Sequence, residues 1–286
     1  MFKNSNRLIP LLILFVGLFI APVAVLALAP GENDEGSLPP TAPSLVDYRL
    51  TPLFKVVPVP KSRKKTPAVN PSILDSPAYA PVIHDTSIPP IVNGLAPLII
   101  NLPTVQKVVF LGIDDGAFKQ PFEINLLKRN HVKASLFLSN LFIKNEPDFF
   151  AGFIPNGSLV ENHTVNHRML SRLTYLEQKR EICDEADLQQ QQFGRRPVLF
   201  RPPGGDYNKN TQRAAAACGM KAVVLWISKA NGGSMQYQVG TRLQPGDIVL
   251  MHFRPEFAKD FQAFLEAEKI AGLHTELLED WLPATQ

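Results

Sequence analysis

Cysteine and net charge are both scarce in this chain of 286 residues. Its two cysteines, Cys183 and Cys218, are too few for a disulfide scaffold or for a zinc site built from thiolates. The 29 Lys and Arg residues against 26 Asp and Glu residues give a formal net charge of +3, so no overall basic field indicates a nucleic-acid partner. Hydrophobic residues make up 45% of the chain, which excludes wholesale disorder and is enough for a core.

Charge is also missing from one long stretch near the N-terminus. No charged side chain occurs between Leu8 and Ala29, and a helix of that length would cross a bilayer at about 1.5 Å rise per residue. Lys3 and Arg7 precede this stretch, so we expect the N-terminus inside the cell and the rest of the chain outside. The stretch predicts export, either on a retained membrane anchor or, if a signal peptide is cleaved near residues 27–29, as a secreted protein.

Proline is concentrated in the segment that follows. Fifteen of the 26 prolines lie between Pro30 and Pro103, where they remove backbone donors and favour extended backbone. We expect a linker here that is partly ordered near its end, because the apolar run Ile91 to Leu102 can dock on the next domain. The chain is therefore divided into three parts: residues 1–29 as signal peptide or anchor, residues 30–106 as linker, and residues 107–286 as folded domain.

Short apolar runs alternate with amphipathic segments in residues 107–286. Five runs rich in Val, Ile, Leu or Phe predict strands: Lys107 to Ile113, Ala134 to Leu138, Val198 to Phe200, Ala222 to Trp226 and Ile248 to Met251. Thr174 and Glu177 form a capping box for a helix that would stop at Gly194, and Asn210 is expected to cap a second helix that ends before Gly219. This alternation predicts a parallel sheet, doubly wound or closed into a barrel, with the site at the carboxyl ends of the strands.

Two polar clusters have the composition of a metal site. Asp114 and Asp115 follow the first predicted strand, and adjacent carboxylates there are costly unless a ligand binds them; the alternative is an ordinary acidic turn closed by Gly116. His163 and His167 are four residues apart, which would place them on one face of a helical turn, although surface histidine pairs also occur by chance. Two histidines and one carboxylate would form a metal site with open positions for water.

Two more clusters follow later strands. Arg201 precedes two prolines and the pair Gly204 and Gly205, so it could orient a carboxylate while the glycines let backbone N–H groups approach a ligand. The alternative is a proline-rich turn with a surface arginine. His252 ends the last predicted strand, where it is either a proton donor or a structural residue.

In this order and spacing, the clusters resemble the polysaccharide deacetylases, the NodB-homology enzymes of carbohydrate esterase family four. The resemblance covers residues 107 to about 282 and rests on four motifs, at residues 113–116, 163–167, 201–205 and 250–252. It implies an α/β fold, a distorted (β/α) barrel that is incomplete relative to eight repeats. It also implies hydrolysis of N-acetyl groups on a sugar polymer, here expected to be peptidoglycan or another cell-envelope polysaccharide.

The resemblance assigns a role to each matched charged residue at the first three motifs. Asp115, His163 and His167 would hold a divalent metal ion, most often Zn²⁺. Asp114 would be the general base that takes a proton from the attacking water, and Arg201 would orient Asp114.

The resemblance further implies that His252 protonates the leaving amine, that the backbone N–H near Gly204 stabilises the oxyanion, and that Leu250 lines the pocket for the acetyl methyl group. Gly204 stands where the family usually has Tyr. The acidic pair of the family's Asp-x-x-Asp-Trp motif falls on Lys229 and Gly232, so His252 lacks its usual partner.

Three functions are therefore compatible with the sequence. The first is a metal-dependent deacetylase that acts on a glycan outside the cell and approaches the membrane through its N-terminal segment. The second is a glycan-binding envelope protein that kept the fold but lost turnover. The third is a hydrolase of small non-sugar amides, which would need a closed pocket. Cys183 and Cys218 fall on predicted helices, where they form either a disulfide or two buried thiols.

Overall fold

The computed structural model describes residues 84–283. The predicted membrane segment Leu8 to Ala29 and the first part of the predicted linker lie outside the described residues. Among the residues that are described, no helix is both long enough and apolar enough to cross a membrane.

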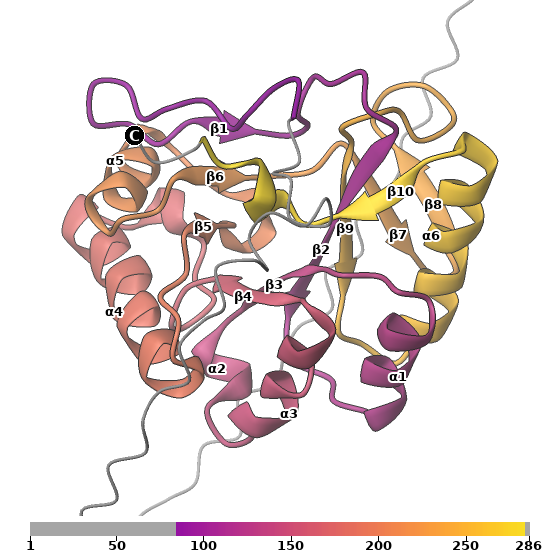
Figure 1. The fold of residues 1–286 in the computed structure, drawn as a ribbon. Coiled ribbons are helices and arrows are strands. Elements are labelled where there is room, and N and C mark those ends of the chain that lie inside the picture. The colour runs from indigo at the N-terminus through magenta and orange to yellow at the C-terminus, as the bar shows by residue number, and fades with distance from the viewer. Residues whose placement is uncertain (1–83, 284–286) are drawn as a thin grey trace, which may run out of the picture. The chain divides into compact units, whose positions relative to one another are not determined.

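Strands and helices alternate along residues 84–283 (Figure 1). The strands are β1 (Leu98–Ile99), β2 (Val108–Asp115), β3 (Ser135–Leu138), β4 (Leu159–Asn162), β5 (Leu199–Phe200), β6 (Ala222–Val224), β7 (Ser228–Asn231), β8 (Ser234–Tyr237), β9 (Ile248–His252) and β10 (His274–Glu276). The α-helices are α1 (Pro121–Arg129), α2 (Asn140–Ile143), α3 (Pro147–Ala151), α4 (Tyr175–Phe193), α5 (Lys209–Ala217) and α6 (Phe257–Ala271). Four 3₁₀ helices are η3 (Ile154–Asn156), η4 (Leu170–Arg172), η5 (Pro203–Gly205) and η6 (Leu278–Trp281).

The helix signals in the sequence are confirmed at α4 and shifted at α5. Thr174 caps α4 and forms a capping box with Glu177, and Gly194 ends the helix at φ 74°. The predicted cap of the second helix is wrong by two residues, because Asn208 and not Asn210 caps α5. The Asn208 side chain accepts a hydrogen bond from the backbone N–H of Asn210, which already lies in the first turn.

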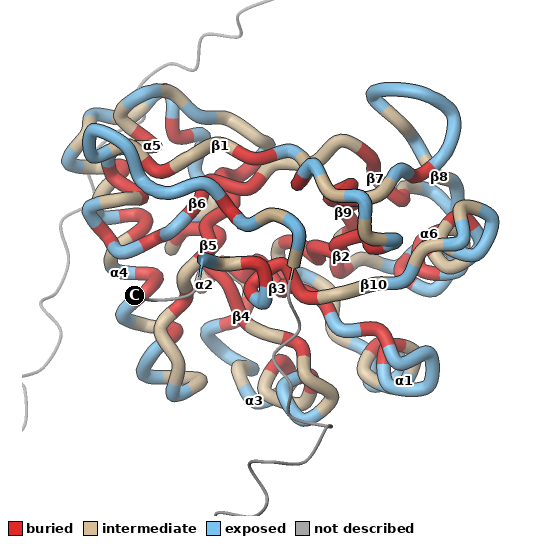
Figure 2. The backbone as a smooth tube through the Cα atoms, turned by 45° about the horizontal axis from the view of Figure 1, so that its top comes forward, coloured by how far each residue is buried: buried red, intermediate tan, exposed pale blue. Residues whose placement is uncertain are grey.

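A single sheet carries all the strands in the order β1-β6-β5-β4-β3-β2-β9-β7-β8, and β10 also pairs with β2. Every neighbouring pair is parallel except the β7–β8 hairpin. The sheet curls, with the longer helices on its outside, as Figures 1 and 2 show. The alternation of strands and helices predicts a parallel sheet, and the incompletely closed barrel is the one that the family resemblance implies.

Side chains alternate between the two faces of the curled sheet. On β2, Val109, Leu111 and Ile113 are buried in the cluster that includes the aromatic residues of α6, whereas Val108 and Phe110 are buried in the cluster inside the barrel. A third cluster packs α4 and α5 against the outer face of β5 and β6. The strands are therefore buried on both faces (Figure 2), which explains their continuous apolar runs.

The segment 84–106, which the sequence places in the linker, bridges two distant strands of the sheet. Its strand β1 pairs with β6, while Asn101 forms a bridge with Asp247 and the Leu102 N–H donates to the carbonyl of Gly246, 2.9 Å away. Gly246 has φ 81°, and a Cβ there would lie 1.7 Å from the Leu102 oxygen. The contact therefore requires glycine, and it ties β6, through β1, to the turn before β9.

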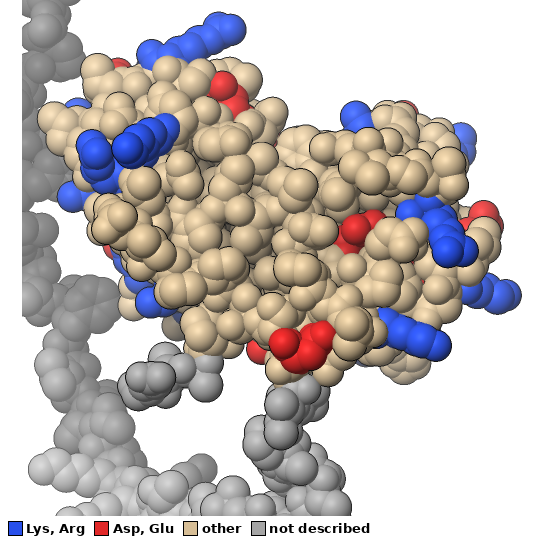
Figure 3. All heavy atoms as spheres, turned by 90° about the horizontal axis from the view of Figure 1, so that it is seen from above, with Lys and Arg blue, Asp and Glu red and all other residues tan. Residues whose placement is uncertain are grey.

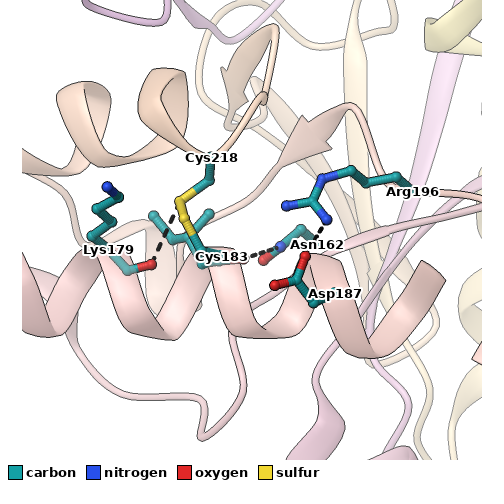
Figure 4. Close-up of a disulfide and its surroundings, with 7 residues drawn as sticks. Asn162, Lys179, Cys183, Asp187, Arg196 and Cys218 are labelled. Atoms are coloured by element: carbon teal, nitrogen blue, oxygen red, sulfur yellow. Dashed lines mark hydrogen bonds and ion pairs between the residues drawn. A yellow bond between two sulfur atoms is a disulfide. The ribbon is translucent and has the colours of Figure 1, made fainter. Parts of the chain in front are cut away.

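The two cysteines form a disulfide between α4 and the end of α5, so the alternative of two free thiols is wrong (Figure 4). The Cα atoms of Cys183 and Cys218 are 4.9 Å apart. Beside the disulfide, the Asn162 side-chain amide donates to the carbonyl of Ile182 in α4, 2.8 Å away. The disulfide thus lies near the carboxyl end of β4, on the side of the sheet that α4 covers.

Basic side chains do not gather on the face that Figure 3 shows, the side of the molecule on which β1 lies. Lys and Arg residues lie scattered around its margin, with acidic residues among them. This face offers no continuous basic surface of the kind that binds nucleic acid.

Candidate active site

The four polar clusters all lie where a strand of the sheet ends. Asp115 is the last residue of β2, and His252 is the last residue of β9. His163 directly follows β4, and Arg201 directly follows β5. Because these strands are parallel neighbours or near neighbours in one sheet, their carboxyl ends bring the clusters to the same edge of the barrel.

The backbone at Asp115 turns its side chain into the site. Alternation would place Asp114 inside the barrel and Asp115 on the outer face, but Asp115 has φ 77° and Gly116 has φ 83°. As a result, Asp115 Oδ1 lies 3.3 Å from Nε2 of His163 and 3.1 Å from Nε2 of His167. A left-handed aspartate at a strand end is an uncommon conformation that is typical of functional sites.

The two histidines lie on a loop, so the helical turn predicted for them is wrong. Thr164 has φ 70° and His167 has φ 52°, and neither value is helical. The Asn162 side chain accepts the N–H of Thr164, and the Thr164 hydroxyl accepts the N–H of His167. These local bonds replace the helical ones and still bring both imidazoles to Asp115.

Glu181 of α4 holds the same loop from the other side. Its carboxylate accepts the backbone N–H of Asn166 at 2.9 Å and the Asn166 side-chain amide at 3.0 Å. Its backbone carbonyl accepts the N–H of Val165 at 3.1 Å. Sequence reasoning missed Glu181, because a glutamate inside an amphipathic helix gives no signal of such a contact.

Asp115, His163 and His167 form a ligand set that fits a divalent metal. Each offers one ligand atom, and these atoms lie within 4.8 Å of one another. His163 Nδ1 lies 2.6 Å from the carbonyl of Arg201, so Nδ1 carries the proton and Nε2 presents its lone pair to the site. Two imidazoles and one carboxylate suit zinc and similar ions and leave coordination positions open.

Electrostatics in the ligand set favour a bound cation. Burial opposes ionisation of Asp115, but hydrogen bonds from His163 and His167 outweigh it and hold the pKa of the carboxyl well below its ordinary value. The hydrogen bond with Asp115 in turn raises the pKa of His167, while burial opposes that shift. A metal ion can take the place of the shared protons, because it would supply the positive charge that the carboxylate already attracts.

Arg201 is completely buried, which excludes the surface arginine considered as an alternative. Its NH1 donates to Asp114 Oδ1 at 2.6 Å, its Nε donates to the carbonyl of Val224 at 3.3 Å, and its NH2 donates to the carbonyl of Leu225 at 3.4 Å. The guanidinium carbon also lies 4.1 Å from the centre of the Phe137 ring. Asp114 is therefore fixed by a buried cation that is itself held by two backbone carbonyls and an aromatic ring.

Gly112 makes room for this arginine, and sequence reasoning missed it. A Cβ at position 112 would lie 2.4 Å from NH1 of Arg201, well inside van der Waals contact. The glycine lies in the middle of a buried strand, where its lack of a side chain indicates close approach by another group.

His252 and Leu250 lie on β9, directly beside β2. In the parallel register His252 is opposite Asp114, and Leu250 is opposite Gly112. Leu250 is buried and His252 is half-buried. Within residues 84–283, the His252 ring makes no hydrogen bond or ion pair.

Three positions depart from the family pattern: Lys229, Gly232 and Gly204. Lys229 of β7 is opposite Leu250, and Gly232 lies in the exposed β7–β8 turn at φ 64°. Gly204 has φ 63°, and the Sδ and Cε atoms of Met169 lie 3.3 Å from where a Cβ would stand on it. Met169 therefore occupies the space that a side chain at position 204 would enter.

Comparisons with known proteins agree with this geometry. The family model of the polysaccharide deacetylases matches residues 101–223. An uncharacterized protein of Streptomyces coelicolor is 36% identical over 194 residues, covering 66% of this chain and 78% of that protein. A peptidoglycan-N-acetylglucosamine deacetylase of Bacillus cereus is 28% identical over 161 residues, covering 53% of this chain and 75% of that protein.

A solved structure shows the same fold. It is that of a pseudoenzyme of carbohydrate esterase family four from Bacillus anthracis, with a TM-score of 0.55 and 19% identity over 65% of this chain and 68% of that one. The matching family model, the similar relatives and the four motifs assembled at one edge of an incomplete barrel lead to one conclusion: this chain belongs to the polysaccharide deacetylase family, the NodB-homology group of carbohydrate esterase family four.

Proposed function

We propose that this protein is a metal-dependent hydrolase that removes N-acetyl groups from a glycan outside the cell, with peptidoglycan as the favoured substrate. The observation that carries the proposal is the buried Arg201–Asp114 pair beside the ligand set of Asp115, His163 and His167. A protein that only binds glycan has no need for an oriented base next to a metal site. The peptidoglycan activity named for the Bacillus cereus relative supports the substrate, and the apolar stretch Leu8 to Ala29 supports the location.

In the proposed reaction, a divalent metal would supply a Lewis acid beside the acetyl carbonyl. Asp114 acts as the general base, because Arg201 occupies Oδ1 and leaves Oδ2 to accept a proton from the attacking water. The buried guanidinium keeps Asp114 in one orientation as the proton transfers. Asp114 Oδ2 also lies 3.8 Å from His163 Nε2, which places the base next to the ligand set.

His252 acts as the proton donor to the leaving sugar amine, which would otherwise have to leave as an amine anion. Its position opposite Asp114 on the neighbouring strand puts base and acid on adjacent sides of one site. The backbone N–H at Gly204 would stabilise the developing oxyanion, and the buried Leu250 would line the acetyl methyl pocket.

The second candidate is a glycan-binding protein without turnover. Two observations favour it: the His252 ring has no hydrogen-bond or ion-pair partner among residues 84–283, and a pseudoenzyme shares this fold. Asp206 could in principle replace the carboxylate that usually partners the general-acid histidine. Its side chain instead accepts the N–H of Ser171 at 2.7 Å.

Acetate release by the purified protein decides between the two candidates. N-acetylglucosamine oligomers and peptidoglycan fragments are supplied with chelator, and then with added zinc. We expect release that the chelator abolishes and zinc restores. A folded, zinc-loaded protein that releases no acetate would establish the binding protein instead.

Two variants test the assigned roles. Asp114→Asn should retain zinc and lose about 10²- to 10⁴-fold in hydrolysis, because the general base is gone. His163→Ala should lose zinc itself, as measured by metal content after dialysis. An Asp114→Asn protein with normal activity would refute the mechanism.

A further inference from the structure

Lys229 faces the same side of the sheet as the candidate active site. Its neighbours Ser228 and Ala230 are buried, and Ala230 packs in the outer cluster with α6. Because side chains alternate along a strand, Lys229 lies on the inner face, opposite Leu250 of β9. His252 follows two residues later on that strand and on the same face.

The Lys229 ammonium has no counter-charge in the part of the chain that the structure describes. It is half-buried, yet it makes neither an ion pair nor a hydrogen bond there. Other half-buried cations do: Arg195 contacts Glu161 at 2.7 Å, and Arg254 contacts Asp260 at 2.6 Å. An unpaired cation beside a candidate active site is a binding group for an anion.

Lys229 lines a small polar cavity that is open on one side. Its volume is about 200 Å³, and it is lined by Trp226, Ser228, Lys229, Gln236, Tyr237 and Gln238. The lining holds amide and hydroxyl groups that can donate hydrogen bonds, and it holds no carboxylate. The cavity has room for a carboxylate with a few carbon atoms, and a single lysine provides one matching charge.

Trp226 connects the cavity to the Arg201 motif. A Cβ on Gly205 would lie 3.1 Å from the Trp226 ring, and the Arg201 guanidinium lies 6.0 Å from the centre of that ring. Trp226 therefore lines the cavity on one side and borders the Arg201 motif on the other.

We propose that this cavity binds a carboxylate carried by the glycan, so that Lys229 makes the enzyme selective for acidic over neutral N-acetylated strands. The inference rests on the proposed function, because it assumes that a glycan occupies the neighbouring site. In peptidoglycan the carboxylate has two sources, the lactyl group on the sugar and the attached peptide. Both present the same chemistry to Lys229.

Binding by the full chain tests this selectivity, with the metal removed by chelator so that no substrate is consumed. Three probes are compared by calorimetry: a neutral N-acetylglucosamine oligomer, glycan strands with free lactyl carboxylates after peptide removal, and strands that keep their peptides. Lys229→Gln should lose about five- to tenfold in affinity for a carboxylate strand and nothing for the neutral oligomer, whereas Lys229→Arg should keep most of the affinity. Lys221→Gln, at an exposed lysine before β6, is the matched control and should bind like the wild type.

The result also identifies the carboxylate. A Lys229-dependent preference for peptide-free strands assigns the lactyl group, and one seen only with intact strands assigns the peptide. Equal affinities of wild type and Lys229→Gln for all three probes, or an equal loss on the neutral oligomer, would overturn the inference.

Acetate release by the zinc-loaded protein separates this inference from the proposed function. Release from neutral and acidic strands alike, unchanged in Lys229→Gln, would leave the deacetylase standing and remove the carboxylate site. Lys229-dependent binding without any acetate release would support the carboxylate site and contradict the deacetylase function.

Discussion

Gly112 leaves the space into which the Arg201 guanidinium packs, so no larger residue fits at position 112 unless the guanidinium moves. In Gly112→Ala the new Cβ would lie 2.4 Å from NH1, which must displace the 2.6 Å bond to Asp114. We expect kcat for acetate release to fall at least about tenfold, because the base loses its orientation, while zinc content stays unchanged. Gly94→Ala is the control for a glycine substitution away from the site: its φ of 70° strains the local turn, but nothing lies within 4 Å of its Cβ position, so kcat should not change. Normal kcat in Gly112→Ala would show that Arg201 can relax without effect.

Glu185 is a buried acid on α4 whose protonation should contribute to the pH dependence of stability. Burial raises its pKa to about 8, against opposing hydrogen bonds from Gln189 and the backbone of Asn140. Between the ordinary pKa of 4.5 and about 8 the folded state therefore holds a proton that the unfolded chain has released. The free energy of unfolding consequently falls as the pH rises through this window and levels off above it.

Glu185→Gln mimics the neutral acid and should remove this contribution. We expect the variant to exceed the wild type by on the order of 1–3 kcal/mol at pH 8, and by little at pH 5, in urea unfolding. Asp184→Asn, an exposed neighbour on the same helix, is the control. The same pH slope in wild type and Glu185→Gln would mean that Glu185 is already ionised in the folded protein.

The convergence of the candidate residues could be predicted from the sequence, but their conformation could not. The carboxylates, histidines and arginine follow strands, so their convergence is a consequence of parallel topology. The spacing of His163 and His167 fits a helical turn equally well, and the loop conformation is selected by the hydrogen bonds that the Asn162 and Thr164 side chains accept from backbone N–H groups. The contact between Gly112 and Arg201 joins residues 89 positions apart, and no local pattern encodes it.

At the scale of elements, the disulfide joins α4 to the end of α5 across a sequence separation of 35 residues. Replacing Cys183 and Cys218 together by Ala should lower the free energy of unfolding by about 3–4 kcal/mol, because the unfolded chain gains loop entropy. Zinc affinity should change little, since the ligands lie on other elements. Unfolding of the oxidised wild type, the reduced wild type and the double variant measures this. Equal stability of all three would mean that α4 and α5 hold together without the bond.

Elements with strong local signals were predictable, and the β7–β8 hairpin was not. Helix α4 has a capping box at one end and a left-handed glycine at the other, both visible in the sequence. Strands β7 and β8, with the sequences Ser-Lys-Ala-Asn and Ser-Met-Gln-Tyr, contain few residues that favour strands. They form because β9 offers an edge and because Gly232 and Gly233 supply two positive φ angles for the turn.

At the scale of the whole molecule, both ends of the described chain meet at the side of the barrel opposite the site. Trp281 of η6 is fully buried against Phe110 of β2, and the Ile88 N–H donates to the Trp281 carbonyl at 2.8 Å. His84 stacks on the same indole, with ring centres 4.0 Å apart. Residues far apart in the sequence thus pack together at this end of the barrel. The prolines of residues 84–106 predict a linker, so the contribution of this segment to the packing was missed from the sequence.

This arrangement predicts that a fragment 107–286 folds poorly compared with a fragment 84–286. The shorter fragment loses β1 and three almost fully buried side chains, Ile88, Ile99 and Leu102. Each is worth about 1.5–3 kcal/mol, so their combined loss rivals the 5–15 kcal/mol that stabilises a typical domain. We expect a lower midpoint of thermal unfolding and a Trp281 fluorescence spectrum shifted towards that of exposed indole. Equal midpoints would show that the barrel is complete without residues 84–106, whereas a large difference makes this proline-containing segment part of the domain that presents the active site.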